Sequence, residues 1–343
     1  MNKTKNALVI SGGGSKGAFA VGAVTHLIKD LKLDFDIISG TSVGALIAPL
    51  IVTNEISDLN ETFSSLTTKD LFRKRWLPFA FLFRDSVFDV KPGWKRIQKE
   101  LDEDRCRIIL NSNKQMFLTT VNLQTGRVVY FQSGPATKTN GDVAVTPLRN
   151  REQLLKAVLA SANQPVLMKP VEVMNNGGPL RQYVDGGVRE IAPLKIAIDN
   201  GATDIYAIIL SPEKHEPVEK RYNRIPKILL RTISLFTEEI VLNDAQIAQL
   251  YNEGIVYVDC LKKRLREKFG LEGKEIDELF AADEIPNPFK GKRVVNLHII
   301  RPGEELPTDG LDFQPEIMQR MIKIGKSRAD EMVTAKERSR LVH

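Results

Sequence analysis

The sequence lacks the long hydrophobic runs that membrane-spanning helices need. No apolar stretch reaches about eighteen residues, the minimum for a transmembrane helix, and residues 1–6 are largely polar. The apolar stretch that follows is short and broken by glycine, which is unlike a secretory signal. We therefore expect a cytoplasmic protein without a transmembrane helix. Peripheral association with the inner membrane face stays open.

Cysteine is also scarce. Cys106 and Cys260 are the two cysteines, and they lie too far apart in the chain for metal-ligand spacing. The acidic residues do not cluster at the spacing of calcium ligands either. We therefore expect free thiols, no metal and no cofactor.

The bulk composition is that of an ordinary globular protein. Of 343 residues, 42% are hydrophobic and 27% are charged, which is enough apolar surface for a large core. The net charge of +6 fits weak attraction to an anionic surface. No nucleic-acid-binding motif accompanies it, so we do not expect a nucleic-acid partner. These features do not predict an oligomeric state.

Histidine is too rare and too poorly placed to suggest a Ser-His-Asp triad. His26 falls within a predicted helix, His215 in a charged loop, His298 within a predicted strand, and His343 is the last residue. None has the loop context of a catalytic base. For a nucleophilic serine in this chain, these contexts favour a carboxylate over a histidine as the base.

The first fifty residues alternate between strand and helix patterns. Apolar runs predict strands at 7–10 and 35–38, and helical periodicity predicts helices at 19–31 and 45–52. Such alternation predicts a parallel sheet covered by helices. Because Pro49 lies inside the second helix, we expect a kink or an early end there.

The rest of the chain adds further elements. Strands are predicted at 115–121, 127–131, 166–173, 181–184, 204–210 and 294–300. Helices are predicted at 151–160, 227–251, 261–269 and 315–337.

The serine turn between the second strand and the second helix is the strongest single motif. Gly40, Thr41, Ser42, Val43 and Gly44 form Gly-x-Ser-x-Gly. A sharp strand-to-helix turn exposes the serine hydroxyl, and small flanking residues avoid a clash there. The motif predicts that Ser42 is a nucleophile.

The loop after the first strand is rich in glycine. Its backbone N–H groups are suited to a negative charge, either a phosphate or an oxyanion. Gly12, Gly14 and Gly17 match the dinucleotide spacing, but the acids that should close the second strand precede it. A Walker loop is excluded because Gly17, not Ser or Thr, follows Lys16. Beside a serine turn, an oxyanion hole is the better interpretation.

A carboxylate follows the predicted strand at 181–184. Asp185 precedes Gly186 and Gly187, which by itself is ordinary turn chemistry. A carboxylate at the end of a strand is also where a catalytic base would lie.

These motifs, taken together and in order, resemble the patatin-like phospholipases. The matching segments are Gly12–Gly17, Gly40–Gly44, the Ala-Ser-x-x-x-Pro stretch Ala160–Pro165, and Asp185–Gly187. The resemblance covers about residues 6–210. It implies an α/β fold, a three-layer α/β/α sandwich of modified α/β-hydrolase type with a mostly parallel sheet. We expect one domain over 1–343, with a mainly helical C-terminal extension at about 211–343 and a final strand near 293–300.

The resemblance also implies hydrolysis of acyl esters in lipids by a dyad of Ser42 and Asp185 through an acyl-enzyme. The oxyanion hole is assigned to the loop, with Gly13 and Gly14 as the main donors. The loop residues so assigned are Gly12, Gly13, Gly14, Ser15 and Gly17.

Two further contacts with lipid are predicted. Lys16 is a candidate contact for an anionic headgroup, with a solvated lysine as the alternative. The aromatic and basic stretch near residues 71–96 is predicted to be either a lid or membrane contact, or a buried aromatic segment. Its candidate contact residues are Trp76, Phe79, Phe81 and Phe83.

The motifs leave other functions open. The protein could be a lipase that a partner or small ligand activates through the region beyond residue 210, or a transacylase. A lipid-binding protein without turnover is disfavoured because the motifs are intact.

Overall fold

The computed structural model describes residues 4–74, 86–137, 144–174, 178–213, 221, 225–280 and 293–341. The four aromatic residues of the predicted lid, Trp76, Phe79, Phe81 and Phe83, lie outside these residues. So do His215 and His343.

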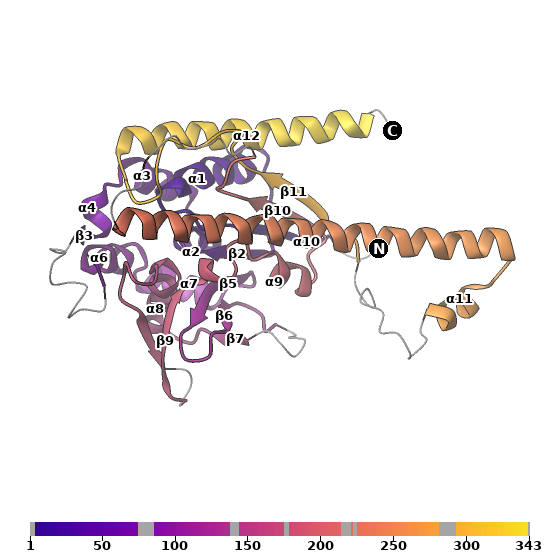
Figure 1. Ribbon diagram of the computed structural model, residues 1–343, viewed down its shortest axis with the longest axis horizontal. Coiled ribbons are helices and arrows are strands. Elements are labelled where there is room, and N and C mark those ends of the chain that lie inside the picture. The colour runs from indigo at the N-terminus through magenta and orange to yellow at the C-terminus, as the bar shows by residue number, and fades with distance from the viewer. Residues whose placement is uncertain are drawn as a thin grey trace.

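A sheet of nine strands forms the middle layer of the described chain (Figure 1). Its strands are β1 (Asn6–Ile10), β2 (Ile37–Thr41), β5 (Gln115–Asn122), β6 (Val128–Ser133), β7 (Ala144–Pro147), β8 (Val171–Met174), β9 (Leu180–Asp185), β10 (Asp204–Ile208) and β11 (Asn296–Ile300). A separate pair joins β3 (Arg73–Lys74) to β4 (Phe88–Asp89).

The sheet is mostly parallel, as the alternation of strands and helices predicted. Its order is β11-β10-β1-β2-β5-β6-β7, and the first five strands of that order run parallel to their neighbours. β5 pairs antiparallel with β6, in the predicted hairpin, and also with β9. β7 returns to a parallel pairing with β6, and β8 extends β9 in antiparallel fashion.

Helices cover both faces of this sheet (Figure 1). They are α1 (Gly17–Thr25), α2 (Val43–Val52), α3 (Ile56–Ser65), α4 (Thr68–Leu71), α6 (Lys91–Glu100), α7 (Glu103–Leu110), α8 (Arg151–Ala162), α9 (Leu194–Asp199), α10 (Ile225–Phe269), α11 (Gly273–Phe280) and α12 (Pro315–Leu341).

The strands are buried on both faces because each faces a layer of helices. In β1, Leu8 and Ile10 join the core shared with α1, α2, α8 and α12, whereas Ala7 and Val9 join a second core with α9. Two-sided burial explains why β1 is a continuous apolar run and not an alternating one. The predicted three-layer α/β/α architecture is therefore confirmed.

Several element boundaries differ from the predictions. The helices predicted at 227–251 and 261–269 are one helix, α10, because no proline separates them and a helix of this length tolerates the single Gly254. The strand predicted at 166–173 begins only at Val171, since Val166 has a positive φ of 70°. α2 does not end at Pro49. It continues to Val52, and Thr53 donates to the Pro49 carbonyl to close the last turn.

The C-terminal part of the chain packs on the first part. β11 pairs with β10, and α12 lies along α1 and α3, as Figure 1 shows. α10 extends beyond the sheet and carries α11 at its far end. Among the helices of the described chain, none is long and apolar enough to cross a membrane.

Candidate active site

Ser42 stands at the sharp turn between β2 and α2. Its φ and ψ are 57° and −120°, a conformation that costs a non-glycine residue on the order of 1–3 kcal/mol. A Cβ on Gly40 would lie 2.4 Å from the carbonyl carbon of Gly44, and one on Gly44 would lie 2.3 Å from the Ile10 oxygen. The turn is therefore strained and tight, as the motif predicted, and the Ser42 side chain faces a cavity.

A second serine holds this turn against the sheet. The backbone N–H of Ser42 donates to the Ser161 hydroxyl at 3.0 Å, and that hydroxyl donates to the Thr119 carbonyl of β5 at 2.7 Å. Ser161 is fully buried. Its role was not predicted from the sequence, although it belongs to the Ala-Ser-x-x-x-Pro stretch that carries the resemblance.

Strand register brings Asp185 level with Ser42. Thr41 of β2 pairs with Thr119 of β5, and the next residue of β5, Thr120, pairs with Asp185 of β9. Because β6 occupies the other side of β5, β2 and β9 pair with the same side of β5 one after the other, and the end of β2 meets the end of β9 there. The Ser42 side chain hydrogen-bonds to the Asp185 carboxyl.

The Asp185 carboxyl is only 3% exposed. Burial raises its pKa to about 6, against the lowering effect of hydrogen bonds from the Ser42 side chain and the Gly187 N–H. The Gly187 N–H lies 2.8 Å from Oδ1, and the Asp185 N–H donates to the Asn163 carbonyl at 2.9 Å. The carboxyl is therefore held in place, and its pKa is better matched than that of a free aspartate to proton transfer near neutral pH.

The glycine loop lies at the same edge of the sheet, but its N–H groups differ in their partners. The Gly12 N–H donates to the Ile191 carbonyl, the Ser15 N–H to the Gly310 carbonyl, and the Gly17 N–H to carbonyls within the loop. Within the described residues, the N–H groups of Gly13 and Gly14 make no hydrogen bond. These two amides are therefore the ones in the loop without a hydrogen-bond partner among the described residues.

A cavity of about 860 Å³ joins these parts. Ser42, Asp185 and Gly12–Gly14 line one end of it, and apolar side chains line much of the rest. Those side chains include Leu46, Leu50, Phe63, Phe72, Ile97 and Met168. The space is apolar enough to hold a hydrocarbon chain beside the serine.

Lys16 also lines the cavity, but it has an acidic partner within the chain. Its Nζ lies 3.5 Å from Glu305 Oε2. An anionic headgroup would therefore compete with Glu305 for this charge.

The two described histidines, His26 and His298, lie away from the cavity and contact other side chains. His26 Nδ1 lies 2.9 Å from Asp30, and His298 stacks on Tyr206 with Nε2 3.7 Å from Asp204. Both are largely buried, and neither lines the cavity around Ser42.

The protein thus has an α/β fold. At one edge of its sheet lie a serine in a sharp strand-to-helix turn, a buried carboxylate beside it and a glycine loop. Comparison with known families agrees. The model of the family described as "Patatin-like phospholipase" matches residues 8–198. The chain belongs to the patatin-like phospholipase family.

Individual relatives are distant. A patatin-like phospholipase domain-containing protein of Pyricularia oryzae is 26% identical over 212 residues, covering 57% of this chain and 25% of that protein. A cGAMP-activated phospholipase of Escherichia coli is 24% identical over 197 residues, covering 53% of this chain and 51% of that protein. The matches thus span about a quarter and about half of these relatives. Among solved structures, VipD of Legionella pneumophila has 14% identity and a TM-score of 0.44, covering 97% of this chain and 67% of that one.

Proposed function

We propose that this protein is a lipid acyl hydrolase that cleaves acyl esters with a dyad of Ser42 and Asp185. The hydrogen bond between the Ser42 side chain and a buried carboxyl whose pKa is raised to about 6 carries this proposal. An ordinary aspartate is a weak base, and the raised pKa brings Asp185 closer to the range where general bases work well.

The reaction has two steps. Ser42 Oγ attacks the ester carbonyl carbon while its proton passes to Asp185, and the N–H groups of Gly13 and Gly14 bind the oxyanion. The ester bond then breaks, the departing alkoxide takes the proton from Asp185, and the acyl group stays on Ser42. In the second step Asp185 removes a proton from water, which attacks the acyl carbon. The bond between that carbon and Ser42 Oγ then breaks, Ser42 Oγ takes the proton back from Asp185, and the fatty acid leaves. The apolar part of the cavity holds the acyl chain.

A serine-directed fluorophosphonate tests the nucleophile. We expect the wild type to be labelled at Ser42 and to hydrolyse soluble p-nitrophenyl esters, and Ser42→Ala to lose both. Removal of an acyl-enzyme nucleophile typically costs about a 10⁶-fold loss of turnover. Ser64→Ala is a matched control, because that hydroxyl is exposed and donates within α3, to the Glu61 carbonyl. Equal labelling of wild type and Ser42→Ala would exclude this mechanism.

The same protein preparation can identify the lipid substrate and the acyl acceptor, which is water for a hydrolase and an alcohol for a transacylase. Phospholipids and monoacylglycerols, each tested with and without added glycerol, report which lipid is cleaved. Free fatty acid as the main product supports hydrolysis. An acylated glycerol would instead support a transacylase.

We also propose, as a second possibility, that a small ligand activates the enzyme. One relative is a cGAMP-activated phospholipase, which motivates a direct test. Ester hydrolysis is measured with and without a cyclic dinucleotide. An increase that Ser42→Ala abolishes supports activation, and full activity without ligand argues against it.

A further inference from the structure

The segment between β11 and α12 forms one wall of the active-site cavity. We call residues 305–313 the C-terminal strap. All of its residues from Glu305 to Phe313 line the cavity that Ser42 also lines. The strap lies outside the 8–198 match to the family model, so that match does not account for it.

The strap contacts the glycine loop directly. The Gly310 carbonyl accepts a hydrogen bond from the Ser15 N–H at 2.9 Å, and Thr308 Oγ1 lies 2.6 Å from Ser15 Oγ. Gly14 has a φ of +57°, and a Cβ there would lie 1.9 Å from the Gly310 oxygen. The loop and the strap are therefore packed backbone to backbone at Gly14, one of the two assigned oxyanion donors, and at Ser15, which follows it.

The Thr308 hydroxyl has three polar neighbours. Its Oγ1 lies 3.2 Å from the Asp312 carbonyl oxygen, which can only accept, and 3.2 Å from the backbone N of Gly310, whose N–H can only donate. A hydroxyl has one proton and two lone pairs, so all three hydrogen bonds form together when the Ser15 hydroxyl donates to Thr308. Thr308 thereby connects the turn of the strap to the fully buried Ser15.

The far end of the strap is anchored to the fold. The Phe313 N–H donates to Thr68 Oγ1 at 2.9 Å, and the Thr68 N–H donates to the Phe313 carbonyl at 3.1 Å. The Phe313 ring is 7% exposed and meets Phe72 edge-on at 6.4 Å between centroids. The strap is therefore a fixed support for the loop.

We propose that Thr308 and Gly310 are positioning residues, which hold Gly13 and Gly14 through Ser15 in the geometry that binds the oxyanion. This inference rests on the proposed function. Donors to an oxyanion act only when they are already aimed at it, so a small shift of the loop should cost turnover more than substrate binding.

Thr308→Val tests the proposal because it keeps the shape of the side chain and removes the hydroxyl. We expect kcat on a soluble ester to fall about tenfold or more, short of the roughly 100- to 1,000-fold loss seen when an oxyanion donor is removed outright, with KM little changed. Labelling of Ser42 by the fluorophosphonate should slow in parallel. Thr308→Ser, which restores the hydroxyl, should recover most of both rates.

Thr203→Val is the matched control. Its hydroxyl also joins distant segments, since it accepts the Lys5 N–H at 2.8 Å and donates to the Lys5 carbonyl at 3.1 Å. Thr203 directly precedes β10, whereas Ser42 directly follows β2. Because these strands run parallel, the two residues lie at opposite edges of the sheet, and the kcat of Thr203→Val should equal that of the wild type.

A double-mutant cycle adds a second test from the other side of the bond. If one bond carries the effect, Ser15→Ala with Thr308→Val should be no slower than the slower single variant. If the double variant loses kcat by the product of the two single losses, the proposal is overturned. It is also overturned if both single variants match the wild type in kcat and in labelling rate. Failure of the wild type to be labelled at Ser42 would instead overturn the proposed function. If Thr308→Val does not fold, the same two rates measured on Ser15→Ala alone decide between these outcomes.

Discussion

At the scale of single residues, the site depends on one buried carboxyl. Asp185 has a hydrogen bond from the Ser42 side chain on one side and from the Gly187 N–H on the other, yet burial still raises its pKa to about 6. Burial dominates because a charge with little solvent loses more hydration than two hydrogen bonds return. The sequence could predict the pair of residues but not this balance, which depends on the burial of the strand end.

The raised pKa predicts how activity depends on pH. Asp185 must be ionised to accept a proton, so kcat/KM on a soluble ester should be flat at neutral pH. It should fall about tenfold per pH unit below about 6. Asp185→Asn, with no titrating group, should be inactive throughout. Circular dichroism at each pH separates this loss from unfolding. Unchanged activity down to about pH 4.5 would contradict the assignment of Asp185 as the base.

In the glycine loop, the sequence did not predict which amides have hydrogen-bond partners. Sequence reasoning assigned five loop residues to the oxyanion hole, and three of those amides, on Gly12, Ser15 and Gly17, donate to carbonyls in the structure. The partner carbonyls of Gly12 and Ser15 belong to Ile191 and Gly310, far along the chain, where no local pattern indicates them. Gly13 and Gly14 are therefore the two oxyanion donors in the proposed mechanism.

At the scale of elements, α12 packs closely on α1. A Cβ on Gly22 would lie 1.9 Å from the Ile322 carbonyl oxygen, and one on Gly325 would lie 1.9 Å from that of Phe19. Small residues on both helices thus let the two backbones approach each other. This explains why the hydrophobic periodicity of either helix alone did not reveal the partner.

We predict that Gly22→Ala or Gly325→Ala destabilises the protein. Alanine favours a helix by about 1 kcal/mol over glycine, but a clash with a backbone oxygen can be relieved only by separating the helices. The free energy of unfolding in urea should therefore fall by about 1–3 kcal/mol, the usual cost of overpacking.

Gly273→Ala is the control for these variants. It lies at the start of α11, and a Cβ there would meet no atom of the described chain within 4 Å. Its stability should stay at or slightly above that of the wild type. Equal stability of all three variants would show that the close approach of α1 and α12 does not matter.

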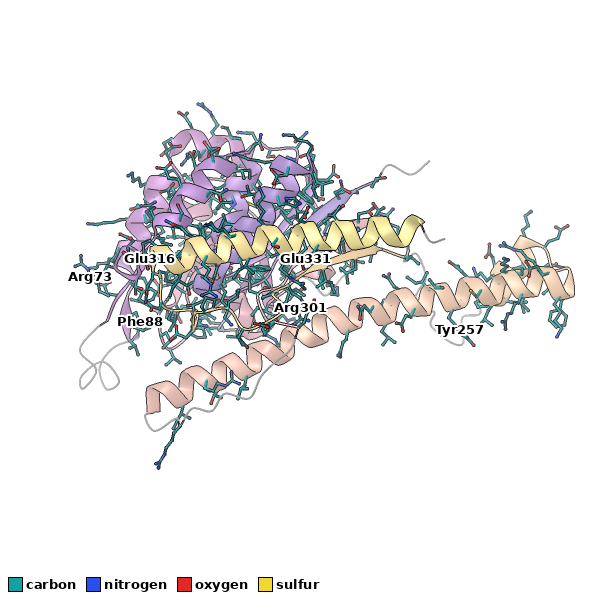
Figure 2. All side chains as sticks on the ribbon, turned by 90° about the horizontal axis from the view of Figure 1, so that it is seen from above. Arg73, Phe88, Tyr257, Arg301, Glu316 and Glu331 are labelled. Atoms are coloured by element: carbon teal, nitrogen blue, oxygen red, sulfur yellow. The ribbon has the colours of Figure 1, made fainter. Side chains whose placement is uncertain are left out.

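At the scale of the whole molecule, the part of α10 from Tyr257 onward and α11 form an arm beyond the body (Figure 2). Tyr257, labelled in Figure 2 on the part of α10 beyond the body, is 65% exposed, and Phe269 is 66% exposed. The two ends of the arm meet: Asn252 exchanges hydrogen bonds of 2.7 and 3.0 Å with the backbone of Val295. The arm is therefore an insertion whose ends are already close.

Deleting residues 257–292 and closing the gap with a short glycine-serine linker should leave the body intact. Because the ends already meet, closure costs little chain entropy. The rate of hydrolysis of a soluble ester should stay within about twofold of wild type, as expected when an exposed insertion is removed. The melting temperature should stay within a few degrees. The full chain, assayed in parallel, is the reference. Loss of folding would show that the arm supports the core.

We propose that the rest of the chain behaves as one unit. β11 completes the sheet beside β10, α12 covers α1, and the strap completes the cavity. Removing residues after 293 would expose the apolar face of α1, whose residues from Gly17 to Val24 are all buried.

The sequence by itself determined the parts of this protein that depend on neighbouring residues. The alternation of strand and helix, the Gly-x-Ser-x-Gly turn, the glycine loop and the Asp-Gly-Gly turn are local patterns, and together they identified the family. Tertiary structure decided what depends on distant residues. The register along β5 sets Asp185 beside Ser42, and the strap contacts the glycine loop. Within the described chain, the carbonyls of Ile191 and Gly310 accept the amides of Gly12 and Ser15, whereas the amides of Gly13 and Gly14 make no hydrogen bond. The reason is physical: local propensities select conformations, whereas hydrogen-bond partners and burial follow from which segments pack together.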